Sequence, residues 1–112
     1  MVGSTPSVRS RVMSGMRSTG RLHFGHLVGV LTQWVRYCDE ADAFFEIADL
    51  HAYTTGFMHP DVIRAARTEL VLDWLAAGVD PSKSTIFLQS AVPEIAELNV
   101  LLGMITPVAW LE

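Results

Sequence analysis

Residues 21–29, "RLHFGHLVG", contain two histidines three positions apart, His23 and His26, with Gly25 between them. Imidazole nitrogens can bind a metal ion, or they can donate N–H groups to phosphate oxygens. Two structural histidines at a turn are a third interpretation. Because no cluster of Cys, Asp or Glu accompanies them, a bound metal explains the pattern least well and none is expected.

The charges of the chain are distributed unevenly along its length. The net charge is -4, yet the first 36 residues contain five arginines and no acid, while all 12 Asp and Glu residues follow. Arg17, Ser18 and Thr19 place charged and neutral donors just before the histidines. Such a stretch can bind a small anion such as a nucleotide, although a basic N-terminal tail of no particular role would look the same.

Hydrophobic periodicity predicts that strands and helices alternate. Strands are predicted at residues 11–15, 43–48 and 84–90. Helices are predicted to begin near His26, at Pro60 and at Pro93, with Trp34 and Trp74 packed on their apolar faces, and Trp110 is also interpreted as a packing residue. This order indicates an α/β fold with parallel strands and crossover helices, a Rossmann-like sheet.

In such a sheet, ligands bind beyond the carboxyl ends of the strands. The segment "SGMRSTGRLHFGHLVG" lies there, between the first strand and the first helix. Gly15 and Gly20 allow backbone geometry closed to other residues, and Gly25 lets a flat group approach the main chain. A helix that begins near His26 would direct its amide N–H groups and its positive end at the ligand. A phosphate site therefore explains the glycines, the charge and the position together.

Length and composition limit the class of protein. A chain of 112 residues provides one domain at most, and its single cysteine, Cys38, excludes an internal disulfide and is predicted to be a packing residue. No uncharged run approaches the ~20 residues that span a bilayer, so no membrane is expected, and the cytoplasm is the default location. Residues 1–10 are predicted to be a flexible tail.

Four blocks of the sequence resemble the bacterial tryptophanyl-tRNA synthetases, which are class I aminoacyl-tRNA synthetases. "HFGH" is similar to the His-x-Gly-His signature of that class. The blocks are "SGMRSTGRLHFGHLVGVL", "FFEIADLHAYTT", "AGVDPSKSTIFLQSAVPEIAEL" and "LLGMITPVAWLE". Tyrosyl-tRNA synthetases of the archaeal type share only the first two.

The resemblance implies roles for individual residues. Arg17, Ser18, Thr19, Gly25 and His26 match positions that contact ATP, and His23 and His26 match the histidines that stabilise the phosphate while the carboxylate of tryptophan displaces pyrophosphate. The residues that match the tryptophan pocket are Met13, Gly15, Asp49 and His51. From the residues alone, Asp49 could cap the end of its strand, His51 could be a hydrogen-bonded core histidine and Met13 could be core. Ser18 stands where that family usually has proline.

The resemblance also implies an activity. Residues 11–112 would form a partial Rossmann-like nucleotide-binding catalytic domain, truncated at its C-terminus, of an enzyme that uses ATP with Mg²⁺ to join L-tryptophan to tRNA(Trp) and that forms a homodimer near residues 92–112. The family's Lys-Met-Ser-Lys-Ser signature is missing, and Lys83 is the only lysine. The alternatives are a tyrosyl-tRNA synthetase, another adenylyl-transferring enzyme with the same signature, or a non-catalytic fragment that serves as an interaction piece.

Overall fold

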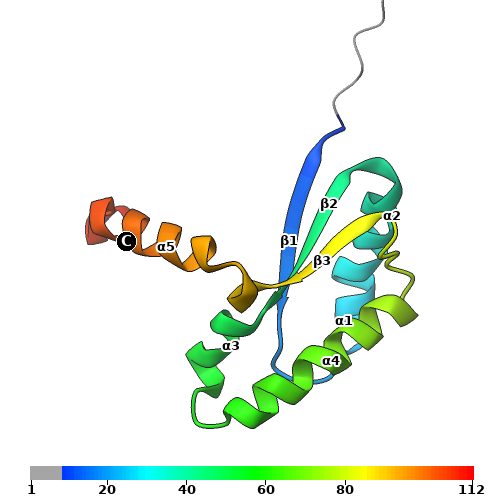
Figure 1. Cartoon of the computed structure of the whole chain (residues 1–112), viewed down its shortest axis with the longest axis horizontal. Helices are drawn as coiled ribbons and strands as arrows, with labels where there is room; N and C mark the ends of the chain where they lie inside the picture. Colours follow the sequence, from blue (N-terminus) through cyan, green and yellow to red (C-terminus); the bar gives the residue numbers. More distant parts are fainter. Residues whose placement is uncertain (1–8) are drawn as a thin grey trace, which may run out of the picture.

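A three-stranded parallel sheet forms the centre of the molecule. The computed structural model describes residues 9–112, in which the strands are β1 (Arg11–Arg17), β2 (Asp42–Ala48) and β3 (Ser84–Leu88). They lie in the order β1-β2-β3 (Figure 1). Arg17 is paired with Ala48 and Ile47 with Leu88, so the three carboxyl ends meet at one edge. The predicted fold class and the three predicted strands are confirmed, except that the third strand ends at Leu88 and residues Gln89–Ala91 form a 3-10 turn.

Two crossover segments connect the strands. The first is helical from residue 24 to residue 40 and consists of α1 (Phe24–His26), a π-helical turn (Leu27–Leu31) and α2 (Thr32–Glu40). The second contains α4 (Pro60–Ala76), which begins at a proline in its first turn, as the sequence predicted. When parallel strands follow one another in chain order, right-handed crossovers place both helices on the same face of the sheet.

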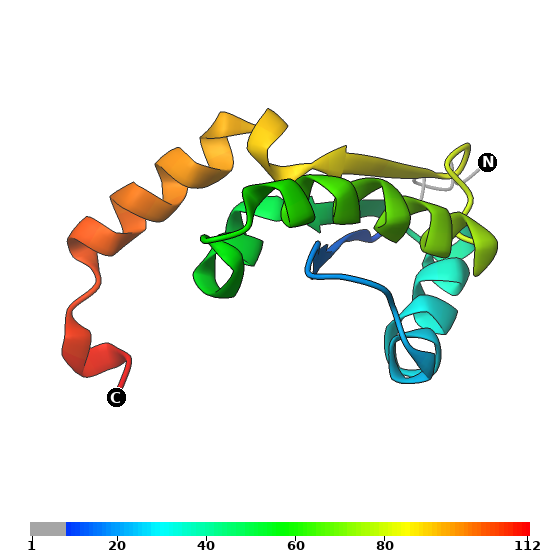
Figure 2. The ribbon, with the colours of Figure 1, turned by 90° about the horizontal axis from the view of Figure 1, so that it is seen from below.

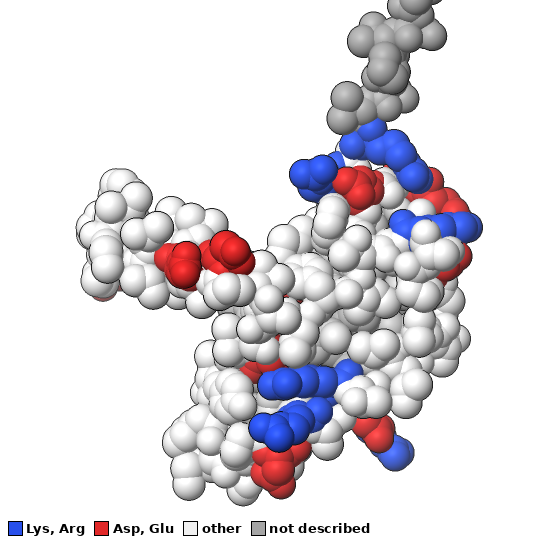
Figure 3. Space-filling view, viewed as in Figure 1, with Lys and Arg blue, Asp and Glu red and all other residues white. Residues whose placement is uncertain are grey.

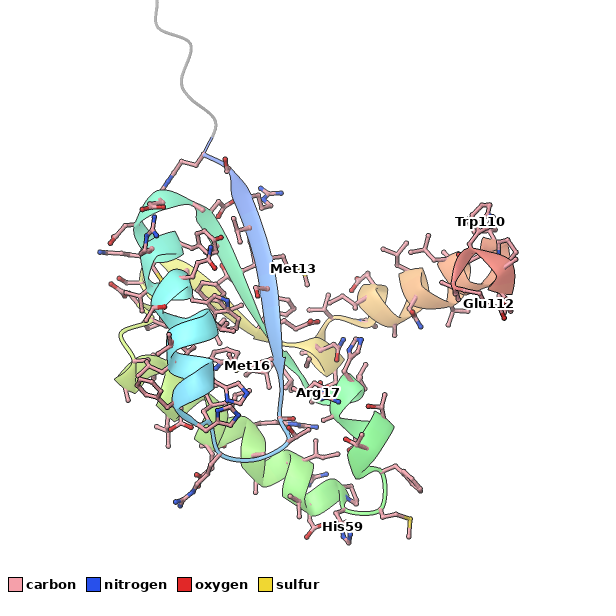
Figure 4. The ribbon with its side chains drawn as sticks, turned by 180° about the vertical axis from the view of Figure 1, so that it is seen from behind. Met13, Met16, Arg17, His59, Trp110 and Glu112 are labelled. Carbon is pink, nitrogen blue, oxygen red and sulfur yellow. The ribbon has the colours of Figure 1, made fainter. Side chains whose placement is uncertain are left out.

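The core lies between that face and the two helices. The ring of Phe45 stacks on Trp34 of α2 at 4.3 Å between centroids, and Trp74 of α4 meets Trp34 edge-on at 4.9 Å. Both tryptophans and Cys38 are buried, as predicted. Met16 joins this core, whereas Met13 points to the other face of the sheet and is 58% exposed (Figure 4). The interpretation of Met13 as a core residue is therefore wrong.

Two helices depart from the sequence prediction. The helix α3 (Asp49–Gly56) follows β2 directly and was not predicted. The helix α5 (Pro93–Ile105) begins where it was predicted, but it projects away from the sheet, and its described residues include no buried one (Figure 2). Trp110, which was interpreted as a packing residue, is 75% exposed beyond the end of α5.

The amino-terminal end of the sheet is held by polar contacts. The backbone N–H of Asp42 donates to the carbonyl of Ser10 at 2.9 Å, and Arg11 pairs with Asp42 at 3.1 Å. Residue 10, which was assigned to the flexible tail, is thus attached to β2, while residues 1–8 lie outside the described residues. None of the described helices is both long enough and apolar enough to span a membrane.

Candidate functional site

The carboxyl edge of the sheet carries three buried polar residues, each of them the first residue after its strand. Ser18 follows β1, Asp49 follows β2 and Gln89 follows β3, and their exposed fractions are 0%, 0% and 2%. Buried polar groups are costly unless they are hydrogen-bonded, so three of them at one edge indicate a specific arrangement. This is also the edge at which ligands bind in open α/β sheets.

Asp49 and Gln89 bind each other's chain segments. Oδ1 of Asp49 accepts from the backbone N–H of Ser90 at 3.0 Å and of Leu50 at 3.1 Å. Oε1 of Gln89 accepts from the N–H of Leu50 at 3.1 Å and of His51 at 3.3 Å. These contacts satisfy amide groups in the first turn of α3, which has no side-chain cap from the residue that precedes it.

Arg67 of α4 forms an ion pair with Asp49. Nη2 of Arg67 lies 2.8 Å from Oδ2 of Asp49, and the carboxylate side chain is fully buried. The approach lacks the angle of a hydrogen bond, and Nε of Arg67 and Oδ2 of Asp49 have no hydrogen-bond partner among residues 9–112. Asp49 therefore connects β2, β3 and α4, and this structural role agrees best with the interpretation that it caps the end of its strand.

His51 is exposed on α3 and is held by Gln89. Nε2 of Gln89 lies 2.7 Å from Nδ1 of His51. Because the amide nitrogen can only donate, Nδ1 accepts and the neutral ring carries its proton on Nε2. His51 lines a surface hollow between α3 and α5, together with Thr54, Ile95 and Asn99. The interpretation as a hydrogen-bonded histidine is correct, but His51 does not belong to the core.

His23 and His26 cap the first helical turn reciprocally. Nδ1 of His23 accepts from the backbone N–H of Gly25 at 3.1 Å, and Nδ1 of His26 accepts from the N–H of His23 at 3.2 Å. The two ring centroids lie 4.0 Å apart. Since both Nδ1 atoms accept, each neutral imidazole presents Nε2–H as a donor. The two histidines therefore lie at a turn, as one interpretation proposed, and each neutral ring keeps one N–H donor that the cap does not use.

This cap corrects one detail of the sequence prediction. The helix begins at Phe24, near His26 as predicted, but the N–H of Gly25 is bound to His23 instead of being available to a ligand. A Cβ on Gly25 would lie 2.9 Å from Cε1 of His23, so any other residue at this position would displace the His23 ring from its cap. Gly25 therefore serves the cap, a role that the sequence did not indicate.

The loop between β1 and α1 is anchored to α4. Gly20 has a φ of 134°, which only glycine adopts readily, so that part of the prediction is confirmed. The N–H of Leu22 donates to Asp73 at 3.4 Å, and Arg21 pairs with Glu69 at 3.6 Å. Arg17 and Thr19 are exposed, whereas Oγ of the buried Ser18 has no hydrogen-bond partner among the described residues.

Gly15 lies against a neighbouring carboxylate that leaves little room for a side chain. A Cβ on Gly15 would lie 3.0 Å from Oε2 of Glu46, its register partner on β2, and its φ is not in the left-handed region. Gly15 was predicted to supply unusual backbone geometry, and it supplies close approach instead. Burial raises the pKa of the Glu46 carboxyl above its ordinary value of 4.5, an effect that Asp49 reinforces and His51 opposes.

The predicted residues fall into two groups. Arg17, Ser18, Thr19, His23, Gly25 and His26 lie in the segment between β1 and the first turn of the helix, and Met13, Gly15, Asp49 and His51 lie on or just beyond β1 and β2. Sequence reasoning missed Gln89, Arg67 and Glu46, which hold or adjoin the second group. Two of them had a signal in the sequence: Glu46 and Gln89 are polar residues within otherwise apolar predicted strands.

At the opposite, amino-terminal edge of the sheet, charged side chains pair with one another. Lys83 precedes β3 and pairs with Asp39 at 2.7 Å, so it lies at the amino-terminal edge, away from the candidate site. Figure 3 shows Lys and Arg at both ends of the sheet, while the projecting arm that contains α5 shows only acidic and uncharged residues. Across residues 9–112, no group of three or more His, Cys, Asp or Glu side chains could hold a metal ion.

A parallel sheet with crossover helices, and with a glycine-containing turn and a capped helix start beyond its first strand, defines a Rossmann-like α/β domain. Over residues 5–112 the chain matches the family described as "tRNA synthetases class I (W and Y)", and it belongs to that family.

Curated relatives and solved structures agree with this family. The chain is 57% identical to a tryptophan–tRNA ligase of Ralstonia nicotianae over 102 residues, which cover 91% of this chain and 26% of that protein. It is 48% identical to a tryptophan–tRNA ligase of Thermotoga maritima over 103 residues, 91% of this chain and 31% of that protein. The chain thus spans about a quarter to a third of the length of these relatives.

Two crystal structures show the same fold. The tryptophanyl-tRNA synthetase of Campylobacter jejuni complexed with ADP and tryptophan superposes with a TM-score of 0.80 at 32% identity, covering 88% of this chain and 31% of that one. The enzyme of Mycoplasma pneumoniae gives a TM-score of 0.83 at 29% identity, covering 89% and 30%.

Proposed function

We propose that residues 11–112 form part of the catalytic domain of a tryptophan–tRNA ligase. In this reaction the carboxylate of L-tryptophan attacks the α-phosphorus of ATP, pyrophosphate leaves, and the tryptophanyl group then passes from the adenylate to tRNA(Trp). The observation that carries the proposal is 57% identity to a tryptophan–tRNA ligase over 91% of the chain. The structure of a similar enzyme with ADP and tryptophan supports both ligands.

The turn after β1 is proposed to bind the phosphates of ATP. The Nε2–H groups of His23 and His26, which the cap leaves unused, are donors that can bind negative charge as it develops on the phosphate during adenylate formation. Arg17 is exposed at the carboxyl end of β1 and can neutralise a phosphate, with Thr19 adding a hydroxyl. Mg²⁺ would enter with ATP, whose phosphate oxygens are its usual ligands in such enzymes.

The residues along β1 and beyond β2 are proposed to contact tryptophan. Met13 and Gly15 lie on the face of the sheet opposite the aromatic core, where Met13 is exposed and Gly15 leaves room beside β2. His51 presents Nε2–H on α3, in an orientation fixed by Gln89. Asp49 is proposed to fix the start of α3 through its hydrogen bonds to backbone N–H groups, and not to touch the substrate.

Other parts of the enzyme are proposed to complete the site. Lys83 is engaged with Asp39 at the opposite edge and cannot supply the lysines that hold the triphosphate. The exposed apolar side chains of α5, such as Leu98 and Leu101, suit the proposed homodimer interface. The cytoplasm is the location that fits a role in protein synthesis. We therefore expect the 112-residue chain alone to bind ATP weakly and not to charge tRNA efficiently.

Pyrophosphate exchange tests the proposal. The chain is assayed with each of the twenty amino acids, alone and with the complementary segment of the Ralstonia nicotianae relative added in trans. We expect exchange that depends on tryptophan and on the added segment. Exchange with tyrosine would favour the tyrosine branch of the family. No exchange with any amino acid, despite a stable complex between the two segments, would favour a non-catalytic interaction piece.

A further inference from the structure

Glu46 is a buried carboxylate in the middle of β2. Its exposed fraction is 8%, and Oε1 has no hydrogen-bond partner among residues 9–112. Side chains alternate between the two faces of a strand, and Phe45 packs into the aromatic core, so Glu46 points to the opposite face. A buried carboxylate that lacks a donor is costly in a folded chain, which makes it a candidate for binding a ligand.

The neighbours of Glu46 are residues of the proposed tryptophan pocket. Gly15 lies beside it on β1, where the absent side chain leaves space for the carboxylate: a Cβ there would be 3.0 Å from Oε2 and 3.1 Å from Cβ of Glu46. His51 and Asp49 lie near enough to affect the pKa of the Glu46 carboxyl, which burial raises most, His51 lowers and Asp49 raises. Asp49 is already bound by Arg67, so its own charge is compensated.

The chemistry of this position selects one kind of ligand group. A desolvated carboxylate is best compensated by a cation that also donates hydrogen bonds, because such a contact is stronger than one to a neutral donor. Tryptophan carries one cation, its α-ammonium group. Resting on the function proposed above, we propose that Glu46 binds the ammonium group of the amino-acid substrate and thereby excludes molecules that lack it.

Equilibrium binding of three probes to the 112-residue chain tests this role. L-Tryptophan has the ammonium, carboxylate and indole groups; tryptamine lacks the carboxylate; and indole-3-propionate lacks the ammonium. Dissociation constants are measured by NMR titration for the wild type and for Glu46→Gln, which nearly preserves the volume of the side chain. We expect the variant to bind L-tryptophan and tryptamine roughly 10-fold or more weakly, with unchanged affinity for indole-3-propionate.

The controls separate this role from a structural one. Glu97→Gln, on the exposed surface of α5, should change none of the three affinities. Equal weakening of all three probes by Glu46→Gln, or no weakening, would overturn the proposal, and so would a wild-type chain that binds no amino acid. A loss that instead depends on the ring N–H, detected with 1-methyltryptophan, would assign Glu46 to the indole and also contradict it.

The outcome for Glu46 is distinguishable from the outcome for the proposed function. If the wild type prefers another amino acid, and Glu46→Gln weakens that amino acid but not its deaminated analogue, then the choice of tryptophan is wrong and the role of Glu46 stands. If the wild type prefers tryptophan and the variant binds it equally well, then the function stands and the role of Glu46 is wrong.

Discussion

The side chains of Asp49 and Gln89 cross between two adjacent strand ends, and each binds the backbone that follows the other's strand. Oδ1 of Asp49 accepts from the N–H of Ser90 at 3.0 Å, and Oε1 of Gln89 accepts from the N–H of Leu50 at 3.1 Å. The ends of β2 and β3 are thereby connected beyond the last pair of the sheet, Ile47 and Leu88. These hydrogen bonds fix the position of the first turn of α3.

Removing the Gln89 side chain should loosen α3 at its first turn. Gln89→Ala leaves the N–H of His51 without its acceptor, and we expect the free energy of unfolding to fall by about 1–3 kcal/mol. Urea unfolding measures the loss, and hydrogen exchange should become faster at His51. Gln33→Ala, which removes an exposed hydrogen bond to Tyr37, is the control and should stay within about 0.5 kcal/mol of the wild type. Equal effects of the two variants would contradict the role of Gln89.

Arg67→Met should destabilise the chain strongly. The change leaves the fully buried carboxylate of Asp49 without its counter-ion, and breaking a buried pair costs about 3–5 kcal/mol. We expect a value near the lower limit, because the side chain of Arg67 is itself 26% exposed. Arg64→Met, on the exposed side of the same helix, should have little effect on thermal unfolding. A negligible cost for Arg67→Met would show that the pair does not stabilise the fold.

Two substitutions of His26 should separate its cap from its chemistry. In the active enzyme, both His26→Ala and His26→Asn remove the donor at the position of Nε2 and should slow adenylate formation by roughly 10²-fold, with little change in ATP affinity. Oδ1 of asparagine lies near the position of Nδ1 and can still accept from the N–H of His23, so only the alanine variant should also lose stability. Single-turnover kinetics and thermal unfolding make the comparison. Equal loss of rate and ATP affinity would mean that His26 only binds ATP, and inhibition by a zinc chelator would favour a metal site.

Ser18→Pro should stabilise the chain by about 0.4–1 kcal/mol, because proline restricts the unfolded chain when its φ suits the native turn. The buried hydroxyl of Ser18 has no partner among the described residues, so its removal should cost nothing further. Ser18→Ala removes the same hydroxyl without restricting the backbone and is the control in chemical unfolding. If proline is less stable than alanine at this position, the turn has a different backbone from the one that the family resemblance implies.

Glu46 should make stability depend on pH. Below its ordinary pKa of 4.5, the carboxyl is protonated in both the folded and the unfolded chain and contributes no difference. Burial raises the folded pKa, so above 4.5 the unfolded chain releases this proton first, and the free energy of unfolding falls until pH passes the raised value. Glu46→Gln should therefore be more stable than the wild type at pH 7, with the difference vanishing below pH 4.5. A constant difference between pH 3 and pH 8 in urea titrations would contradict this.

The regular elements could be predicted because their apolar residues repeat with a clear period. The strand that contains Phe45 and the helix face that carries Trp74 are both explicit in the sequence, and both are buried as expected. The helix α3 escaped prediction because the segment "DLHAYTTG" has no apolar face, and its start depends on Gln89, which is distant along the chain. The projection of α5 also could not be foreseen, since an apolar helix gives no information about what it packs against.

The candidate site could be predicted where the type of a residue by itself indicates its local backbone conformation. Gly20 has the positive φ that its position after β1 suggested, and the two histidines do lie at a turn. The partners of Asp49 could not be predicted, because they become neighbours only when the ends of three strands and the middle of α4 are aligned. Glu46 was predicted only as part of a strand. That Oε1 of its buried carboxylate lacks a hydrogen-bond partner among the described residues depends on the face of the sheet to which it points.

The strand order β1-β2-β3 has a consequence for the time course of synthesis. Each strand pairs with the strand made immediately before it, and the aromatic core uses nothing beyond Leu88. Pairing between successive segments keeps the loops to be closed short, which favours early folding of a chain as it leaves the ribosome. The sheet and its two covering helices can therefore assemble without waiting for α5 to leave the ribosome.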